Sequence, residues 1–122
     1  MKQKLALIGF GTVGQGLCEI LTNKKSELKE NHDFDWEVVA VSDILKGSVY
    51  CPDGLDVNQL LDLVKSDRSL EEYECKYEKT PCEFGWDAVT TIHSSNADIV
   101  CELSYTDVKT GEPALTHCKT AF

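Results

Sequence analysis

The chain lacks the features that would send it to a membrane or out of the cell. It has 122 residues, and none of its apolar runs approaches the roughly 18 residues that a membrane-spanning helix requires. Its first residues lead directly into a predicted strand, so the apolar stretch and cleavage site of a secretory signal are missing. We therefore expect no membrane partner and a cytoplasmic location.

Positive charge is also scarce. Lys and Arg total 12 against 21 Asp and Glu, which gives a formal net charge of −9. The acidic groups are spread along the chain, so no basic face is available for the phosphates of a nucleic acid. We expect no nucleic-acid partner. An anionic cofactor would have to be captured by local N–H groups rather than by the field of the whole protein.

Familiar catalytic and metal-binding patterns are missing as well. His32, His93 and His117 lie far apart and outside any H-E-x-x-H or serine-elbow context, so we expect surface or capping histidines. The six cysteines are irregularly spaced without C-x-x-C, which excludes a zinc site and favours reduced thiols. Cys18 and Cys101 fall in apolar contexts, where cysteine behaves as a small hydrophobe. We assign no catalytic residue and no metal ligand.

A glycine-rich hexapeptide near the amino terminus is the most informative positive feature. Gly9-Phe10-Gly11-Thr12-Val13-Gly14 matches G-x-G-x-x-G and follows the apolar run 4–8, which predicts a buried parallel strand. Apolar residues then recur at helical spacing, namely Val13, Leu17, Ile20 and Leu21. A strand, a glycine turn and a helix in this order are typical of the phosphate-binding corner of a dinucleotide-binding fold.

Each part of the hexapeptide has a physical role in that corner. Gly9 permits a tight turn, Gly11 lets a pyrophosphate approach the backbone, and Gly14 lets the helix pack against the strand. The N–H groups near Thr12 and Val13 would face the phosphates with the helix dipole behind them. The motif therefore predicts dinucleotide binding, with a merely structural glycine turn as the alternative.

A second buried strand, predicted over residues 37–42, ends at Asp43. In a Rossmann unit this position holds the carboxylate that accepts hydrogen bonds from the adenosine ribose. The distance from Gly14 exceeds the usual spacing of about 20 residues, and a longer helix and a polar loop would absorb the difference. The alternative is that Asp43 caps a turn. A carboxylate here repels a 2′-phosphate and so slightly favours NAD over NADP, unless Lys46 folds back.

The remaining segments complete an α/β pattern. Ser104 and Tyr105 follow a predicted strand at its carboxyl end, where they would meet the cofactor's ribose or nicotinamide amide or act as turn residues. We expect a Rossmann-like open, mostly parallel sheet with helices on both faces, in one domain over residues 1–122. The other expected segments are a helix end and exposed loop at 23–35, a turn-rich loop at 47–54, helical segments at 58–66 and 69–73, a surface excursion at 75–85, a strand or helix at 86–91, a strand at 97–103 and a helix opened by 111–113.

Three stretches of the chain resemble one family. They are residues 6–14, residues 39–43 with 47–56, and residues 97–102 leading to 110–115. Together they resemble the N-terminal nucleotide-binding domain of homoserine dehydrogenases, and the resemblance spans almost the whole chain. The second and third stretches are more specific than the glycine motif.

The resemblance implies an NAD(P)-dependent oxidoreductase that interconverts L-homoserine and L-aspartate 4-semialdehyde in threonine and methionine biosynthesis. It implies NAD or NADP as cofactor, with the pyrophosphate on residues 9–14 and the adenosine ribose at Asp43. Ser104 and Tyr105 would line the route toward the nicotinamide.

The chain departs from the family in one respect. The family continues into a substrate and dimerisation domain that carries its catalytic lysines and acids, and no such residues follow here. We therefore expect the chain alone to be inactive, with a small-molecule substrate bound only by a full-length protein. An apolar patch left bare would favour a homo-oligomer. The alternatives are a free-standing NAD(H)-sensing regulatory module and the cofactor domain of another amino-acid-pathway reductase.

Overall fold

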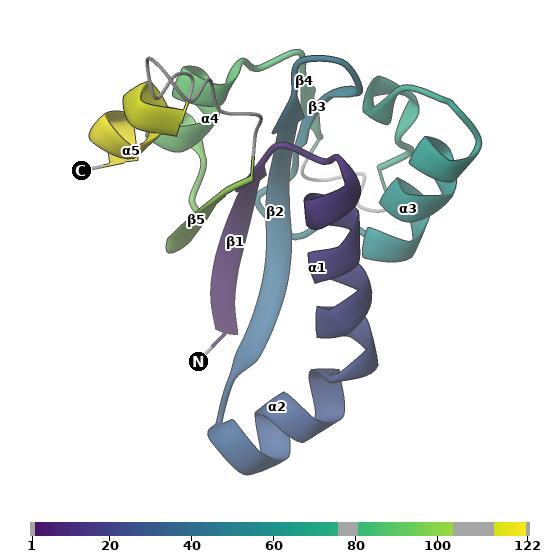
Figure 1. Ribbon diagram of the computed structural model, residues 1–122, viewed down its shortest axis with the longest axis vertical. Coiled ribbons are helices and arrows are strands. Elements are labelled where there is room, and N and C mark those ends of the chain that lie inside the picture. The colour runs from purple at the N-terminus through teal and green to yellow at the C-terminus, as the bar shows by residue number, and fades with distance from the viewer. Residues whose placement is uncertain (1, 76–80, 104–113, 122) are drawn as a thin grey trace.

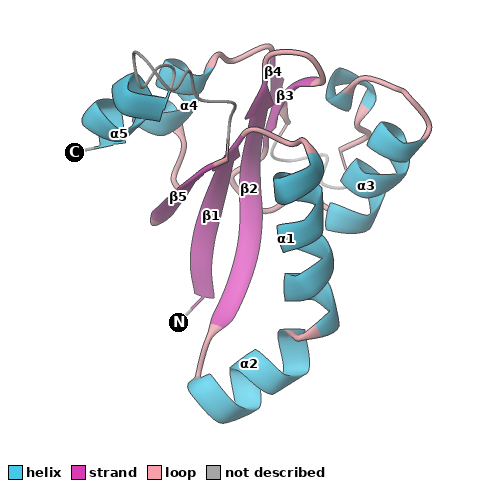
Figure 2. Ribbon diagram, in the orientation of Figure 1, coloured by secondary structure: helices cyan, strands magenta, loops and turns pink. Residues whose placement is uncertain are grey.

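The computed structural model describes residues 2–75, 81–103 and 114–121 (Figure 1). The helices and strands alternate along much of the chain (Figure 2). In chain order they are β1 (Lys2–Ile8), α1 (Thr12–Asn23), α2 (Lys25–His32), β2 (Asp35–Asp43), β3 (Gly47–Tyr50), α3 (Val57–Lys65), the 3₁₀ turn η1 (Leu70–Glu72), β4 (Glu83–Phe84), α4 (Ala88–Ser94), β5 (Ile99–Glu102) and α5 (Ala114–Ala121).

The strands form one open sheet in the order β4-β3-β2-β1-β5. β1 pairs in parallel with β2 on one side and with β5 on the other, whereas β3 and β4 extend the sheet by antiparallel pairing. Helices α1 and α3 lie on one side of the sheet, and α4 and α5 lie on the other (Figure 1). The predicted open α/β sheet with helices on both faces is confirmed.

The larger core lies between the sheet and helices α1 and α3. Leu7, Val41 and Val49 point from neighbouring strands onto this face and meet Cys18 and Leu60 from the helices. All five side chains are almost completely buried, and burying an aliphatic side chain of this size contributes about 1.5–3 kcal/mol. This packing explains why the short apolar runs of the sequence form strands, because each run is covered on at least one face.

The smaller core covers the opposite face, and a β-bulge sets which residues reach it. The register of β1 against β2 shifts between Leu5 and Ala6, which pair with Val38 and Ala40 and leave Val39 as a surplus residue. As a result, Val38 belongs to the larger core, whereas Val39 and Ala40 belong to the smaller one. The bulge thus shifts, halfway along β2, the alternation of its side chains between the two faces of the sheet.

The expected exposed loop over residues 23–35 is wrong in one respect, because most of it forms helix α2. The segment is exposed as predicted, but it holds no glycine or proline and is rich in helix-forming Lys, Glu and Leu. Lys24 and Glu27 form an ion pair at 3.3 Å. Asp33 ends the helix in the left-handed conformation, with φ of 50°, and the Phe34 N–H bonds back to the Leu28 carbonyl at 3.0 Å.

The turn-rich loop expected over residues 47–54 is also wrong at its start, where Gly47–Tyr50 form β3. A three-residue connection reverses the chain after β2, and Gly47 accommodates the reversal with φ of +96°. The Ser42 hydroxyl lies 3.2 Å from that of Ser48 on the paired strand. Residues 47–50 form a strand because they pair with the end of β2.

The expected reduced state of all six cysteines is wrong for one pair. Cys75 and Cys82 form a disulfide, with Cα atoms 6.1 Å apart. The two residues are seven positions apart in the sequence, and the irregular spacing of the cysteines does not indicate that they pair. Cys18 does act as a small hydrophobe, as predicted, and Cys101 packs partly buried against the same core.

The excursion expected over residues 75–85 is mostly exposed in its described part but holds the short strand β4, whereas most other segments follow the predictions. The helix expected over residues 58–66 is α3, the helical turn at 69–73 is η1, and the strand at 97–103 is β5. The ambiguous segment at 86–91 is helical, because Asp87 caps α4 by accepting a hydrogen bond from the Thr90 N–H at 2.8 Å. The final helix is α5, and Pro113 lies outside the described residues.

Candidate functional site

The glycine loop lies at the carboxyl edge of the parallel strands, between β1 and α1. Gly9 turns the chain out of β1 with φ of +102°, a conformation that favours glycine, and its N–H donates to the Ser42 carbonyl at 2.7 Å. Gly11 is the N-cap residue of α1, and no side chain caps this helix start. The loop therefore presents backbone, not side chains, to the space above the sheet.

The three glycines of the motif occupy different surroundings. A Cβ atom on Gly14 would stand 2.7 Å from the Gly9 carbonyl oxygen, closer than real Cβ contacts allow. A Cβ atom on Gly11 would meet nothing within 4 Å. Gly14 is thus needed for the packing of α1 against the loop. Gly11 instead borders open space, which is the arrangement that close approach of a ligand to the backbone requires.

The first turn of α1 leaves backbone donors available. Among the described residues, no acceptor bonds to the N–H groups of Thr12 and Val13. Helix starts leave such donors unsatisfied, and the helix dipole places partial positive charge at the same end. This combination is suited to an anion such as a phosphate.

Phe10 has a different place in the loop. Its side chain is fully buried in the larger core. Its N–H donates to Oδ2 of Asp43 at 2.7 Å, and its carbonyl accepts from the Gln15 side-chain amide at 3.0 Å. Phe10 therefore anchors the loop from below, and both of its backbone polar groups are engaged within the protein.

Asp43 ends β2 and lies against the glycine loop. Besides the bond from Phe10, its Oδ1 accepts from the backbone N–H groups of Leu45 and Lys46, each at 2.9 Å. The turn-capping alternative for this residue is thus observed. A carboxylate has about four acceptor positions, and these three bonds leave one of them for the predicted contact with the ribose.

Apolar side chains are exposed on both sides of this loop. Val13 is 65% exposed at the start of α1, and Ile44 and Leu45 are each 91% exposed in the turn after Asp43. Asp43 joins that turn to the glycine loop through its hydrogen bonds. Exposed apolar groups beside free amide donors suit a ligand with both a flat apolar part and an anionic part.

The structure thus brings Gly9, Phe10, Gly11, Thr12, Val13, Gly14 and Asp43 together at one edge of the sheet. Ser104 and Tyr105 lie outside the described residues. Their roles as cofactor contacts stay predictions.

Sequence reasoning missed a buried pair close to this edge. Glu102 ends β5 and lies opposite Ile8 of β1, and its carboxylate contacts Nδ1 of His117 on α5. His117 is only 7% exposed, so the expectation of a surface or capping histidine is wrong here, whereas His32 and His93 are exposed. The available signal was an acidic residue inside an otherwise apolar strand, which requires a partner when buried.

Two thiols near the same strands carry no charge at neutral pH. Burial raises the pKa of the Cys18 thiol to about 12, and burial also raises the pKa of Cys101. Both therefore remain protonated at neutral pH and act as apolar packing groups. In the described ranges, no group of three or more His, Cys, Asp or Glu side chains could hold a metal ion.

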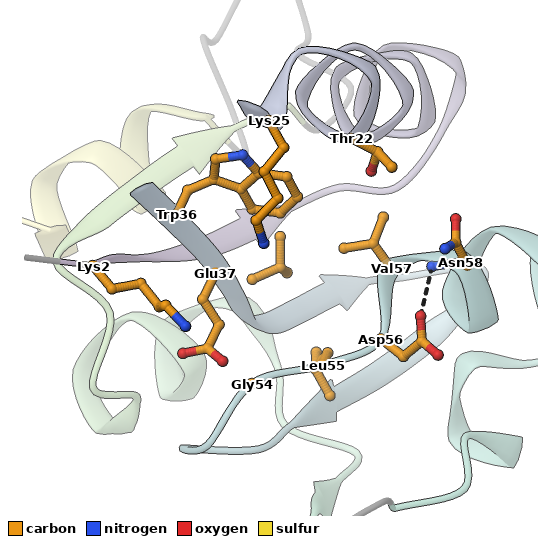
Figure 3. A pocket seen from close by; sticks show the side chains of 11 residues that line it. Lys2, Thr22, Lys25, Trp36, Glu37, Gly54, Leu55, Asp56, Val57 and Asn58 are labelled. Atoms are coloured by element: carbon orange, nitrogen blue, oxygen red, sulfur yellow. Dashed lines mark hydrogen bonds between the residues drawn. The ribbon is translucent and has the colours of Figure 1, made fainter. Parts of the chain in front are cut away.

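A cavity of about 310 Å³ opens at the other edge of the sheet, where β1 and β2 begin (Figure 3). The Lys25 ammonium lies 4.6 Å from the centre of the Trp36 ring, and the Asp56 carboxylate accepts from the Asn58 N–H at 3.0 Å. Ligands of open α/β sheets bind beyond the carboxyl ends of the strands. The glycine loop, not this cavity, is therefore the candidate site.

The fold and the glycine loop together are those of a dinucleotide-binding domain. The sequence model of the glutamate/leucine/phenylalanine/valine dehydrogenases matches residues 1–101. The chain belongs to this family.

None of the helices that the structure describes has the length and apolar character needed to cross a membrane.

Curated relatives confirm the predicted resemblance to homoserine dehydrogenases. The homoserine dehydrogenase of Methanocaldococcus jannaschii is 29% identical over 118 residues, which cover 97% of this chain and 33% of the relative. An NAD(+)-dependent homoserine dehydrogenase of Pseudomonas canavaninivorans is 30% identical over 118 residues, covering 97% and 32%. The chain thus spans about a third of the length of these relatives. Neither alternative function is favoured by them.

Solved structures show the same fold. A hyperthermophilic archaeal homoserine dehydrogenase in complex with NADPH has a TM-score of 0.70 at 20% identity, covering 99% of this chain and 33% of that chain. A homoserine dehydrogenase of Thermoplasma acidophilum has a TM-score of 0.58 at 16% identity, covering 88% and 28%. The family match and the relatives differ in the substrates they name, and they agree on dehydrogenases.

Proposed function

We propose that this chain binds a nicotinamide dinucleotide as a single domain over residues 1–122 of a homoserine dehydrogenase. The observation that carries the proposal is the helix start at Gly11, where open space meets the N–H groups of Thr12 and Val13, from which no described residue accepts a hydrogen bond. The pyrophosphate would bind there, and the exposed Val13, Ile44 and Leu45 would be covered by the apolar parts of the nucleotide.

The other predicted contacts belong to the same proposal. Asp43 would offer its remaining acceptor position to the adenosine ribose, and Ser104 and Tyr105 would line the path to the nicotinamide. The nicotinamide, when bound, accepts or supplies the hydride. The residues described here contribute binding and orientation, and we assign none of them a step in the chemistry.

In the whole enzyme, the reaction we propose is the interconversion of L-homoserine and L-aspartate 4-semialdehyde with NAD(H) or NADP(H), in threonine and methionine biosynthesis. Its support is the pair of homoserine dehydrogenase relatives, one of them NAD(+)-dependent, and the likeness to a homoserine dehydrogenase that binds NADPH. A small-molecule substrate, self-association and a cytoplasmic location are parts of this proposal.

Calorimetric titration of the chain with NADH and NADPH tests the binding site. Gly11→Ala adds a methyl group where the space is open, so we expect a folded protein with at least about tenfold weaker binding, because the methyl group blocks the pyrophosphate. Gly16→Ala is the matched control, since it makes the same change on the same helix in open space away from the loop. Equal binding by the two variants, or no binding by the folded parent chain at millimolar nucleotide, would contradict the proposal.

A further inference from the structure

The two oxygens of the Asp43 carboxylate are divided between two segments of the chain. Oδ2 accepts from the Phe10 N–H of the glycine loop at 2.7 Å, and Oδ1 accepts from the N–H groups of Leu45 and Lys46 in the turn between β2 and β3, each at 2.9 Å. We propose that Asp43 is a positioning residue, which joins the glycine loop to this turn before nucleotide binds.

The energetics favour such a role. Hydrogen bonds from backbone amides to an ionised carboxylate are stronger than those between neutral groups. Three of the roughly four acceptor positions of the carboxylate are already occupied without any ligand. The contact to Phe10 spans 33 residues of sequence and adds a second link between the glycine loop and the end of β2, next to the bond from the Gly9 N–H to the Ser42 carbonyl.

The loop and the turn carry complementary parts of the proposed site. The loop leads into the amides of Thr12 and Val13, which donate to no described residue, and the turn carries the exposed Ile44 and Leu45. A junction that holds the two segments together organises both parts for the same ligand and lowers the ordering cost of binding.

This inference rests on the proposed nucleotide binding. It gives Asp43 a different role in the choice between NADH and NADPH. A carboxylate whose charge is already shared by three amide donors acts on the cofactor mainly by holding the site together. The 2′ position of the ribose is then not its principal target. The loss of Asp43 should weaken NADH and NADPH binding alike. Replacing a residue that only contacts the ribose would weaken NADH binding and leave NADPH binding unchanged or tighter.

The first test needs no nucleotide. Amide hydrogen exchange is measured by NMR on the 122-residue chain and on Asp43→Asn and Asp43→Ala. In Asp43→Asn the one remaining oxygen serves the turn, so we expect the Phe10 amide to exchange at least about tenfold faster while Leu45 and Lys46 stay protected. In Asp43→Ala all three amides should exchange faster. General destabilisation would instead accelerate the core amides of β2 in both variants.

The second test compares dissociation constants for NADH and NADPH. We expect Asp43→Asn to weaken both by similar factors of about ten, which is what the loss of one charge-assisted hydrogen bond produces. Asp98→Asn is the matched control. Its carboxylate also accepts a backbone N–H, that of Lys4 at 2.9 Å, but toward the opposite end of β1. This variant should leave both constants unchanged.

The outcomes separate the two proposals. Unchanged exchange of the Phe10 amide in Asp43→Asn overturns the positioning role, and so does weaker NADH binding with unchanged or tighter NADPH binding. If the parent chain binds neither nucleotide while Phe10 exchange responds as expected, the proposed function fails and the junction at Asp43 stands.

Discussion

Gly14 of α1 lies so close to Gly9 that a Cβ atom on residue 14 would stand 2.7 Å from the Gly9 carbonyl oxygen. The neighbouring group is backbone in the turn that leaves β1, so it cannot rotate away as a side chain would. We expect Gly14→Ala to lower the free energy of unfolding by about 1–3 kcal/mol, as overpacking does in other cores. Urea denaturation followed by circular dichroism measures the change.

The control for this prediction is Gly16→Ala, two residues further along the same helix. A Cβ atom there meets nothing within 4 Å. Alanine in a helix interior is favoured over glycine by about 0.5–1 kcal/mol, so this variant should be slightly more stable than the parent. If both variants gain stability, the close approach of α1 to the loop is not what Gly14 provides.

The start of α4 should give the protein a pH-dependent contribution to stability. Asp87 caps this helix, and its hydrogen bonds with Thr90 lower the pKa of the Asp87 carboxyl. A lowered pKa in the folded state means that the stabilisation is present above the unfolded value of 3.8 and is lost as the pH falls through the lower folded value. We expect Asp87→Ala to cost about 1 kcal/mol at pH 7 and progressively less below pH 3.8.

Thermal melting of the parent and Asp87→Ala between pH 7 and pH 2 provides the measurement. Asp53→Ala is a suitable comparison, since Asp53 is exposed in the turn after β3 and caps no helix. A constant difference in melting temperature at all pH values would show that the cap does not act through the charged carboxylate.

The cysteines should react in a graded way. Cys118 is exposed, whereas Cys18 is buried with its pKa raised to about 12, so a thiol-alkylating reagent at pH 8 should label Cys118 and leave Cys18 unmodified. Above pH 9, the ordinary value for the thiol, folding loses stability because only the unfolded state ionises Cys18 readily. Peptide mass mapping after labelling identifies the modified sites.

A thiol titration in denaturant checks the disulfide in the same sample. Cys75 and Cys82 form the disulfide and the other four cysteines are in the thiol form, so four thiols should react without reductant. All six should react after reduction. Six reactive thiols without reductant would remove the disulfide, and rapid labelling of Cys18 in the native state would contradict its burial.

The elements that the sequence predicted well are those defined by neighbouring residues. β1, the glycine loop and α1 follow from an apolar run, three glycines and a helical repeat, all within 23 residues. The end of β2 at Asp43 follows in the same way from an apolar run that meets a carboxylate. These signals are local, because strand burial, tight turns and helix starts each restrict which residue types can occupy consecutive positions.

The elements that were missed depend on pairing with another part of the chain. β3 becomes a strand because β2 offers it a partner, and Glu102 acquires its partner only once α5 brings His117 to it. The second role of Asp43, as an acceptor for Phe10, likewise spans two strands and their connecting helices. Residue patterns along the chain contain no direct information on such pairs.

The surplus residue at Val39 determines how β2 would respond to the gain or loss of one residue. Side chains of a regular strand alternate between two faces, whereas Val39 and Ala40 both belong to the smaller core. Removing the surplus residue would leave Ala40, Val41 and Ser42 opposite Ala6, Leu7 and Ile8, so Val41 would keep its place in the larger core. An additional residue after the bulge would instead turn Val41 out of that core and move the Asp43 carboxylate away from Phe10. A single-codon insertion far from the glycine motif would thereby disrupt the proposed nucleotide site as surely as a change within it.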